Sequence, residues 1–441
     1  MELTELRQHA RAIFDSGVAS VDARAAIIRA IRFDGNYLRL FDRGFDLSTT
    51  QVYVIAVGKA AAAMAIGLHD SLGDSITRGL ITGALLNSAA GLDPKRWQLL
   101  SGGHPLPNEE SLGAARAAFE LLDHANANRG LVIYLISGGG SAMIEWPRDD
   151  GITLNDLREA NRQLISCGAP IREINAVRRA FSAIKGGGLA TRAPQAEKIV
   201  LIVSDTNAGD ERSVASGPAL LPPSNESDAQ EILARYGLTK SLPASILRTI
   251  LQHESSKPTA VDDTFYVLLD NRTALDSAAR KANTLGIAVE IADDICEQPI
   301  AQGCNLLLER SRDLGKKYGD RPLSLLSGGE FSCPVKGTGV GGRNLETALR
   351  CAIAIDEHGS ADSSHQVVLS GGTDGLDGNS TAAGAIADEL TLRRARQQGL
   401  DAGSFLERSD SFNFFRALGD ELITGPTGTN VRDLRVVLRS L

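Results

Sequence analysis

The sequence predicts an α/β protein of more than one domain, built around a mostly parallel β-sheet. The chain has 441 residues, which suggests two or three domains of about 150 residues each. Hydrophobic residues make up 43% of the chain and charged residues 23%, which is typical of a globular protein. Short apolar runs alternate with helical patterns along most of the chain, and this alternation is typical of right-handed βαβ units.

Composition and charge exclude several kinds of partner. The net charge is −8, from 46 Lys and Arg against 54 Asp and Glu, which disfavours nucleic acid. No apolar run approaches the roughly 18 residues of a membrane span. The five cysteines form no Cys-x-x-Cys pair, and the chain starts with a charged helical pattern rather than a signal peptide. We therefore expect free thiols, a cytoplasmic location, and a small-molecule ligand without a nucleic-acid or membrane partner.

The first half of the chain predicts helices and then a parallel sheet. Residues 1–45 are expected to be helical, with a second helix over roughly 21–33, because apolar residues recur at helical spacing. The run VYVIAV (52–57) predicts a buried strand, and an Ala-rich helix follows at 60–70. Further strands are expected at 79–86, 131–137 and 198–204, with helices between them at 111–125, 154–166 and 173–185.

The second half continues the alternation after a loop. LLPPSNESDAQ (220–230) is rich in Pro and Ser and predicts a loop or a domain edge. A helical stretch is expected over 227–253, and we place a domain boundary near 240–260. The remaining expected strands are 265–270, 288–293, 323–329, 367–372 and a last one in VRDLRVVL, with helices at 271–285 and 344–357.

Ser-Gly-Gly occurs four times, at 101–103, 137–139, 327–329 and 370–372, each time at the end of an apolar run. In open α/β sheets, ligands bind beyond the carboxyl ends of the strands. Glycine turns there would line a crevice with backbone N–H groups, and helices that start just afterwards would favour phosphate. The alternative is that glycine only makes tight turns. The two interpretations stay open at this point.

Lys59 follows a predicted strand and stands at the start of a helix, in VIAVGKAAAAMA (54–65). A cation at a helix N-terminus opposes the helix dipole, so we expect Lys59 to face an anion. The segment is not a Walker A loop, because its glycine spacing is wrong and Ala60 stands where Ser or Thr is needed.

GTGVGG (337–342) matches the dinucleotide-binding pattern G-x-G-x-x-G, but its context does not. The preceding FSCPVK contains Pro334 and is short for a central strand. We favour a mobile Gly-rich loop that delivers Arg343, whose guanidinium group can grip a carboxylate or phosphate with two nitrogens. The alternative is a helix-start arginine paired with a surface acid.

Carboxylates follow two of the predicted strands. Asp374 and Asp377 stand between glycines, and Asp205 and Asp210 lie in SDTNAGD. Their spacing does not match an EF-hand loop. They could hold Mg²⁺ near a phosphate, or they could cap turns. His104, directly before a proline, is interpreted as a turn residue.

Taken together, these motifs resemble those of the MOFRL-type glycerate 2-kinases, some of which carry the name hydroxypyruvate reductase. The resemblance covers most of the chain. It implies a large Rossmann-like N-terminal domain and a smaller α/β C-terminal domain, taken as residues 1–250 and 251–441, with the active site in the cleft between them. The segments that carry it are VGKAAAAMA, GGHPLPNEES, LISGGGSAM, FSAIKGGGLA, SDTNAGDERSVASGP, LLSGGEF, GGRNLE, GGTDGLDGNSTAAGA and TGPTGTNVRDL.

The resemblance also implies a reaction, the transfer of the γ-phosphoryl group of ATP to the 2-hydroxyl of D-glycerate with Mg²⁺. The family's active-site Lys, Asp and Arg fall on Lys59, Asp205 and Arg343. We expect the two cations to serve the phosphoryl group and the substrate carboxylate, in an order left open, and Asp205 to accept or orient the hydroxyl proton. Phosphate contacts are expected from Ser137, Gly138, Gly139, Gly140, Ser141, Gly328 and Gly329, and Mg²⁺ ligands from Asp374 or Glu330.

The sequence departs from the family pattern at a few positions. Arg179-Ala180-Phe181 stand where the family usually has Lys-His-Leu, Gly188 where Arg is common, and Leu345 where Gln is common. Two alternatives therefore stay open, a kinase of a related 2-hydroxy acid and an NAD(P)H-dependent hydroxypyruvate reductase. Whether the chain forms a homo-oligomer stays open too.

Overall fold

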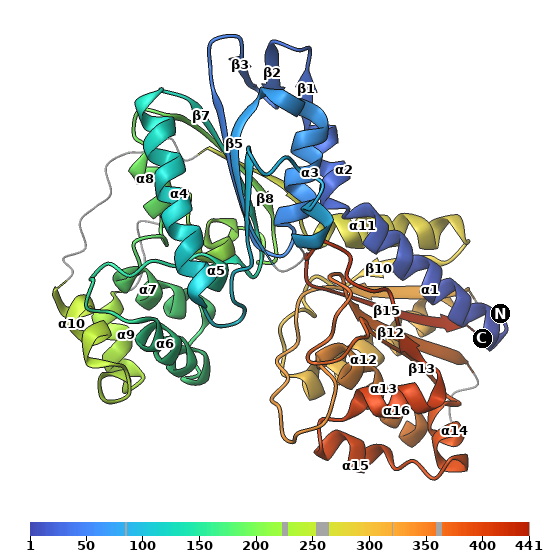
Figure 1. The fold of residues 1–441 in the computed structure, drawn as a ribbon. Helices are drawn as coiled ribbons and strands as arrows, with labels where there is room; N and C mark the ends of the chain where they lie inside the picture. Colours follow the sequence, from blue (N-terminus) through green and yellow to red (C-terminus); the bar gives the residue numbers. More distant parts are fainter. Residues whose placement is uncertain (84–85, 223–227, 253–263, 320, 359–363, 441) are drawn as a thin grey trace. The chain divides into compact units, whose positions relative to one another are not determined.

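The computed structural model describes residues 1–83, 86–222, 228–252, 264–319, 321–358 and 364–440 (Figure 1). The chain divides into two compact units. We call Ala23–Leu269 the parallel-sheet unit, and Met1–Asp22 with Asp270–Leu441 the mixed-sheet unit. The expected domains, 1–250 and 251–441, differ from this division at the boundary and in the first 22 residues.

Six parallel strands form the core of the parallel-sheet unit, in the order β6-β5-β4-β7-β8-β9. Every residue of β4 is buried, as expected for a strand covered on both faces. The chain starts at the centre, builds one half of the sheet and then the other, which is the strand order of a Rossmann sheet. The strands are β4 (Val52–Val57), β5 (Ile76–Thr82), β6 (Trp97–Leu100), β7 (Leu131–Ser137), β8 (Glu197–Val203) and β9 (Phe265–Leu269).

Helices cover both faces of this sheet (Figure 1). α4 (Glu109–Ala127) packs its alanines on Ile55, Val57 and neighbouring strand residues. α4 begins with a capping box in which Asn108 and Ser111 exchange hydrogen bonds. α2 (Ala23–Ala30) and α3 (Ala61–Leu72) pack against each other, and α3 also contacts β4, β5 and β7.

Short helices form a second hydrophobic cluster in the parallel-sheet unit. The expected helical stretch 227–253 is divided, because Gly237 adopts a positive φ of 65° and Pro243 follows before the next helix. The helices of this part are α5 (Gly140–Met143), α6 (Leu154–Ser166), α7 (Ile171–Phe181), α8 (Gly188–Arg192), α9 (Ala229–Arg235) and α10 (Ala244–Gln252). The 3-10 turns of the unit are η1 (Gly73–Ser75), η2 (Leu86–Ala89), η3 (Glu211–Ser216) and η4 (Leu238–Lys240).

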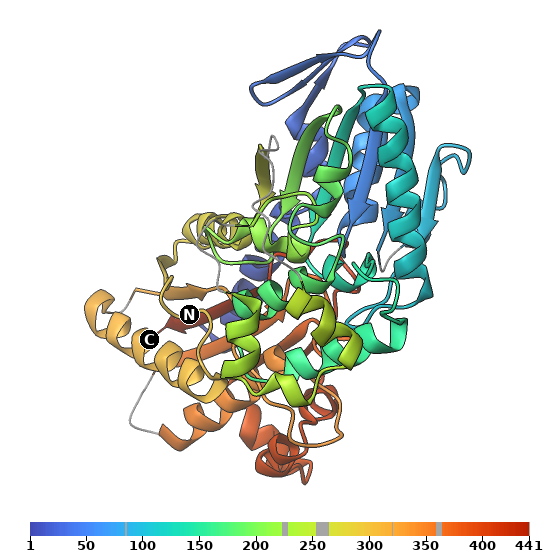
Figure 2. The same cartoon turned by 90° about the vertical axis from the view of Figure 1, so that its left-hand side faces the viewer.

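The prediction that residues 1–45 are helical is wrong at its end. A three-stranded antiparallel sheet follows α2 and is drawn in dark blue in Figure 2. Its strands are β1 (Ile31–Phe33), β2 (Tyr37–Leu40) and β3 (Arg43–Asp46). In β2 burial alternates strictly, with Leu38 and Leu40 inside. Alternation over four residues is too short to stand out against the helical pattern before it.

The sheet of the mixed-sheet unit is mostly antiparallel, which the expectation of a second α/β domain left open. Its order is β10-β11-β15-β12-β13-β14, and only β10 and β11 pair in parallel. The last strand, β15, inserts between β11 and β12 and runs opposite to both. β11 and β12 therefore end at the same edge. The strands are β10 (Ala288–Ile291), β11 (Leu323–Ser327), β12 (His365–Gly372), β13 (Gly384–Asp388), β14 (Glu421–Leu422) and β15 (Asp433–Ser440).

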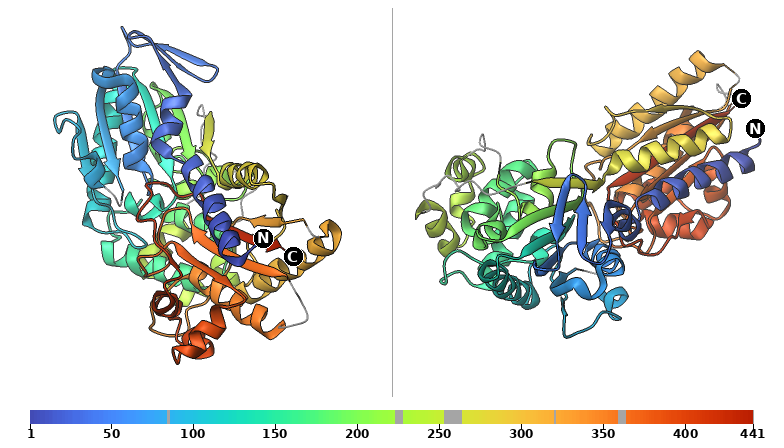
Figure 3. Two further views of the ribbon diagram at one scale, coloured as in Figure 1. Left: turned by 90° about the vertical axis from the view of Figure 1, so that its right-hand side faces the viewer. Right: turned by 90° about the horizontal axis from the view of Figure 1, so that it is seen from above.

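Helices also cover both faces of the mixed sheet (Figure 3). α1 (Leu3–Ser20) lies beside α11 (Asn271–Thr284) and buries Leu6, Ile13 and Phe14 on this sheet. This packing is why the first residues belong to the mixed-sheet unit. α12 (Ile300–Tyr318) and α13 (Arg343–His358) cover the other face, and α14 (Thr391–Gln397), α15 (Ala402–Glu407) and α16 (Ser411–Leu418) pack against α13. Among the described residues, no helix is long and apolar enough to cross a membrane.

Candidate active site

The turn after β4 is joined to the end of β7, where the strand order of the parallel sheet reverses. The N–H of Lys59 donates to the carbonyl of Gly138 at 2.9 Å, and the N–H of Ala60 donates to Ser137 Oγ at 3.0 Å. Gly58 adopts a φ of 116°, and a methyl group added there would collide with the backbone of Ser137. Only glycine allows this close approach. Ligands of doubly wound sheets bind at this reversal point.

Three side chains from neighbouring strand ends gather around the β7 loop. A methyl group added to Gly138 would collide with Oδ2 of Asp205, which follows β8. One added to Gly139 would lie 3.1 Å from Cγ of Lys59 and 3.6 Å from Cε1 of His104. Lys59 and Asp205 are half-buried, whereas His104 is exposed. The structure thus brings the predicted Lys59 and Asp205 to the predicted loop, together with His104, which the sequence analysis took for a turn residue.

The two serine hydroxyls of the loop already have partners within the protein. Ser137 Oγ is buried, accepts from Ala60 N and donates to the carbonyl of Val57 at 3.3 Å. Ser216 Oγ donates to Asn175 Oδ1 at 2.9 Å, so Ser141 must be the donor in its 2.8 Å contact with Ser216 Oγ. Both hydroxyl protons are therefore directed into the protein. A phosphate at this loop would be met by backbone N–H groups.

A buried network of polar side chains supports the loop after β7. The side chains of Lys185 and Glu145 form an ion pair in which each is only 1% exposed, and Ser182 Oγ donates to Glu145 at 2.5 Å. Burial lowers the pKa of Lys185, and the charge of Glu145 opposes that shift. Glu145 lies two residues after the end of α5, so this pair anchors the chain just beyond the helix that starts at Gly140. The sequence analysis did not single out either residue.

Asp210 differs from Asp205, although both lie in SDTNAGD. Its carboxylate forms an ion pair with Arg172 and lies at the start of the 3-10 turn η3. The pairing gives Asp210 a structural role. Asp205 is the carboxylate beside Lys59.

In the mixed-sheet unit, Arg343 is held by two carboxylates. Its Nε and Nη2 donate to the two oxygens of Asp433 at 2.7 and 3.0 Å, and Nη2 also lies 2.8 Å from Oε1 of Glu330. Burial acts to lower the pKa of Arg343, but the charges of Asp433 and Glu330 outweigh it and raise that pKa. Among the described residues, no group accepts a hydrogen bond from the remaining nitrogen, Nη1. That nitrogen is the part of Arg343 that a ligand could use.

The helix that begins with Arg343 is capped by Asp377. The backbone N–H groups of Asn344 and Leu345 donate to its two oxygens at 3.0 and 2.8 Å. Burial raises the pKa of Asp377 to about 7, although these hydrogen bonds act to lower it. The side chain of Asn344 also donates to Asp433 at 2.8 Å. Asp377 therefore belongs to the support of Arg343, which was one of the two alternatives for this carboxylate.

Asp433 is the partner that the sequence analysis missed. It is 1% exposed and stands at the start of β15, ninety positions after Arg343 in the chain. The pattern VRDLRVVL predicts only a strand. An acidic residue at the buried start of a strand was the available signal, because a buried carboxylate needs a partner.

Gly328 and Gly329 also serve the framework of this unit. Their carbonyls accept from Arg435 at 2.5 and 3.0 Å, and the N–H of Gly329 donates to Asn271 Oδ1 at 3.1 Å. The guanidinium carbon of Arg435 lies 3.7 Å from the centre of the Phe331 ring, and burial lowers the pKa of Arg435 to about 10. Of the two N–H groups expected to bind phosphate here, that of Gly329 already has a protein partner.

The GTGVGG loop is tied to its surroundings. The N–H of Gly341 donates to Asn379 Oδ1 at 2.8 Å, the amide of Asn379 donates to Gly339 O at 3.2 Å, and Val340 N donates to Asp410 at 2.9 Å. The described residues between 328 and 342 form no strand, so the loop lacks the strand that a dinucleotide-binding fingerprint requires. It presents Arg343 from a backbone that is hydrogen-bonded to Asn379 and Asp410, and the expected mobility of this loop stays a prediction.

The parallel sheet carries a lysine and a carboxylate at its reversal point, and the second unit holds an arginine between two carboxylates. Together these features define an α/β protein suited to small anionic ligands. The chain matches the domain of unknown function DUF4147 over residues 9–251 and the MOFRL family over residues 323–433. It therefore belongs to the family in which a DUF4147 domain is followed by a MOFRL domain. The family resemblance inferred from the motifs is confirmed.

Similar proteins carry two different names. The D-glycerate 2-kinase of Thermotoga maritima is 35% identical over 396 residues, which is 89% of this chain and 91% of the relative. A putative hydroxypyruvate reductase of Agrobacterium vitis is 35% identical over 438 residues, 98% of this chain and 94% of the relative. The crystal structure of glycerate kinase from Thermotoga maritima matches with a TM-score of 0.81 at 32% identity, over 99% of both chains.

Proposed function

We propose that this protein is a D-glycerate 2-kinase, which transfers the γ-phosphoryl group of ATP to the 2-hydroxyl of D-glycerate and yields 2-phosphoglycerate and ADP. The kinases among its relatives support the reaction. The observation that carries the proposal is the grouping of Lys59 and Asp205 at the glycine loop after β7. A cation, an acid and a backbone N–H loop are the groups that phosphoryl transfer requires.

In this proposal Lys59 neutralises charge and Asp205 handles the proton. Phosphoryl transfer depends mainly on positioning and on charge neutralisation. The ammonium group of Lys59 would offset negative charge on the transferred group, and the loop Gly138–Ser141 would bind phosphate oxygens through its backbone. Asp205 would accept or orient the proton of the 2-hydroxyl.

Arg343 would supply the second cation of the reaction. Asp433 fixes its guanidinium plane from one edge, so the direction of Nη1 is set before a ligand arrives. An anion that approaches Nη1 would also approach the carboxylate of Glu330. We expect Glu330 to move or to be neutralised when ligand binds. That both units contribute residues to one reaction stays a prediction.

The carboxylate oxygens near Arg343 are donors of the kind that Mg²⁺ binds. Mg²⁺ is usually held by one or two carboxylates together with substrate phosphates. Glu330 and Asp374 are half-buried carboxylates, and Glu330 adjoins Arg343. Among the described residues, no three acidic, His or Cys side chains form a ready metal cluster. The ion would neutralise phosphate charge, and it would relieve the repulsion between phosphate and Glu330.

Two further candidate functions each have one observation in their favour. The name of the Agrobacterium vitis relative favours a hydroxypyruvate reductase, but the GTGVGG loop lacks the preceding strand. A kinase of another 2-hydroxy acid is favoured by Arg179, which replaces the usual lysine. Arg179 lies against Gly186, where a methyl group would come within 2.5 Å of its Cδ, and burial lowers the pKa of Arg179 to about 10.

One set of assays tests all three functions. The protein is incubated with ATP, Mg²⁺ and D-glycerate while ADP release is followed, and in parallel with NADH and hydroxypyruvate while NADH oxidation is followed. We expect ADP release and a phosphorus NMR spectrum of 2-phosphoglycerate. Formation of 3-phosphoglycerate, or turnover only with NADH, would contradict the proposal. A higher kcat/KM with another 2-hydroxy acid would identify a different kinase substrate.

A further inference from the structure

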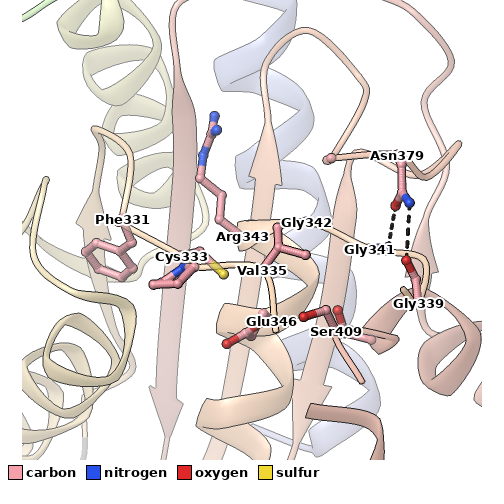
Figure 4. Close-up of a pocket in the computed structure, with 13 residues that line it drawn as sticks. Phe331, Cys333, Val335, Gly339, Gly341, Gly342, Arg343, Glu346, Asn379 and Ser409 are labelled. Carbon is pink, nitrogen blue, oxygen red and sulfur yellow. Dashed lines mark hydrogen bonds between the residues drawn. The ribbon is translucent and has the colours of Figure 1, made fainter. Parts of the chain in front are cut away.

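The mixed-sheet unit contains a cavity of about 460 Å³ beside Arg343 (Figure 4). This volume lies within the range of about 300–1,000 Å³ that is typical of small-molecule sites. One wall is formed by Phe331, Cys333 and Val335, and the other by the GTGVGG loop with Asn379. Glu346, one helical turn after Arg343, also lines the cavity.

The glycine loop is a preformed wall of this cavity. Methyl groups added to Gly339, Gly341 and Gly342 would lie only 2.5 to 2.6 Å from residues behind the loop, such as Asp410 and Ser411. Asn379 holds the loop through hydrogen bonds to Gly339 and Gly341, drawn as dashed lines in Figure 4. Close packing behind the loop and these hydrogen bonds keep the wall in place. A ligand would find the cavity already formed.

The cavity is lined by a carboxylate that is paired with an arginine. Glu346 is 5% exposed, and its Oε1 lies 2.7 Å from Nη2 of Arg350. Burial, and then the charges of Glu346 and Asp377, raise the pKa of Cys333 to about 12. An amine or a hydroxyl could donate a further hydrogen bond to this carboxylate, whereas an anion has no hydrogen to donate to it.

The cavity therefore has two chemically different ends. Figure 4 shows the guanidinium group of Arg343 extending away from Glu346. Neutral hydrogen-bond donors would be favoured at the glutamate, and an anionic group at the arginine once Glu330 has moved or been neutralised. Val335 offers exposed apolar surface in the lining, whereas the Phe331 ring is only 3% exposed and lies against Arg435. A nucleotide has phosphates at one end, a ribose with hydroxyl donors in the middle and a flat base at the other end, which in adenine carries an amine donor.

We propose that this cavity binds the nucleoside part of the phosphoryl donor, with its base against Val335 and its donor groups on Glu346. The proposal rests on the proposed kinase function. It assigns the nucleoside to the mixed-sheet unit, which a Rossmann order in the other unit would not suggest. A 2-hydroxy acid is disfavoured as the occupant, because its carboxylate would face Glu346. A dinucleotide such as NADH offers similar chemistry, so the test includes both.

The first experiment places a reporter at the rim of the cavity. Val335 is 83% exposed, so the variant Val335→Cys should react readily with a maleimide. Labelling of the peptide that contains residue 335 is followed by mass spectrometry, with the wild-type chain as the control for Cys333. We expect ADP and adenosine to slow labelling at least fivefold. D-glycerate and inorganic phosphate should leave the rate unchanged.

The second experiment removes the charge of the acceptor. Glu346→Gln should raise the Kd for ADP, measured by calorimetry, at least tenfold, and leave the KM for D-glycerate within twofold. The matched control is Glu290→Gln, since Glu290 also pairs with an arginine of this unit, Arg310, outside the residues that line the cavity. The control variant should bind ADP as the wild type does. Val335→Cys keeps Glu346 intact, so the first experiment stands even if Glu346→Gln fails to fold.

The outcomes separate this proposal from the proposed function. If ADP binds and the kinase turns over, but nucleotides neither protect residue 335 nor depend on Glu346, the nucleoside lies elsewhere and only the cavity proposal is overturned. If NADH protects and ADP does not, both the cavity's ligand and the kinase function are wrong. If ADP does not bind at all and D-glycerate is not phosphorylated, the proposed function fails, and this inference fails with it.

Discussion

The two units use the same Ser-Gly-Gly motif in different ways. After β7, the glycines let the turn of Lys59 and the side chains of Asp205 and His104 lie close to one loop. That loop lies where the strand order of the parallel sheet reverses. After β11, the carbonyls of Gly328 and Gly329 are held by Arg435, and the N–H of Gly329 by Asn271. The first motif makes a loop that can receive an anion, whereas the second braces a strand end.

The cations of the two units are also treated differently. Arg343 is fixed by Asp433 and Glu330, so that two carboxylates face one guanidinium group. Lys59 stands at the start of α3, where the helix dipole opposes its charge. The comparison teaches that a glycine motif at a strand end does not define a phosphate site by itself. The role of such a motif depends on the charged groups around it and on whether its backbone groups already have hydrogen-bond partners in the protein.

The largest effect is expected in the support of the β7 loop. Lys185→Met would leave the carboxylate of Glu145 buried without its partner, which typically costs about 3–5 kcal/mol of stability. Urea unfolding should show this loss. Lys240→Met, at an exposed position, is the control and should change stability by less than about 0.5 kcal/mol. A Lys185 variant as stable as the wild type would mean that the pair does not support the loop.

Lys59→Ala should separate activity from stability. If Lys59 neutralises charge on the transferred group, kcat should fall by roughly 10²-fold or more. The melting temperature should hardly change, because a cation at a helix start gives little stabilisation. Steady-state kinetics and a thermal melt measure both, with Lys240→Ala as the control. Wild-type turnover would assign Lys59 to the solvated surface.

Arg343→Lys tests the guanidinium group that Asp433 and Glu330 hold. Lysine keeps the charge but cannot hold Asp433 with two nitrogens in one plane, so a loss of about tenfold in kcat/KM is expected. A fall in kcat would indicate contact with the phosphoryl group, which we favour, and a rise in the KM for D-glycerate would indicate the carboxylate. Arg310→Lys, in an exposed pair, is the control. Both parameters within twofold of wild type would remove Arg343 from the site.

The buried cap of α13 should make the stability depend on pH. The pKa of Asp377 is raised to about 7 in the folded protein, above the ordinary value of 3.8. The folded state therefore holds a proton that the unfolded state releases, and this contribution to stability is lost as the pH rises through about 7. The slope is at most about 1.4 kcal/mol per pH unit.

Urea unfolding between pH 4 and pH 8 measures that dependence. Asp377→Asn should flatten the curve over this range, because asparagine cannot ionise. Asp401→Asn is a matched control, since Asp401 also caps a helix of this unit but is exposed. If the variant keeps the wild-type slope, another group is responsible for the pH dependence.

Local pattern was enough to predict most of the parallel-sheet unit. The runs at β4, β7 and β8 are apolar throughout, which is typical of strands covered on both faces. Parallel strands end at one edge, so the grouping of Lys59 and Asp205 could be expected from their positions after β4 and β8. The short strands β1–β3 could not, because alternation over three or four residues carries little information.

The mixed-sheet unit depends on long-range pairing, and the sequence analysis was weaker there. Nothing local indicates that β15 inserts between β11 and β12, or that Asp433 meets Arg343 from ninety positions away. The sequence analysis also could not tell in which direction a hydroxyl donates. Ser137 and Ser141 were expected to contact phosphate as part of their glycine loop, and their hydroxyl protons are directed to Val57 and Ser216.

The smallest effect is therefore expected at Ser141. Its hydroxyl donates to Ser216, which in turn donates to Asn175, so a phosphate at the loop would rely on backbone N–H groups instead. Ser141→Ala should leave the KM for ATP and kcat within about threefold of wild type, and should cost about 1 kcal/mol of stability for the lost hydrogen bond. Ser404→Ala, in an exposed helix, is the control for the stability measurement. A loss of 10²-fold in kcat would show that the hydroxyl turns toward the ligand during the reaction, and that the network below the loop rearranges when substrate binds.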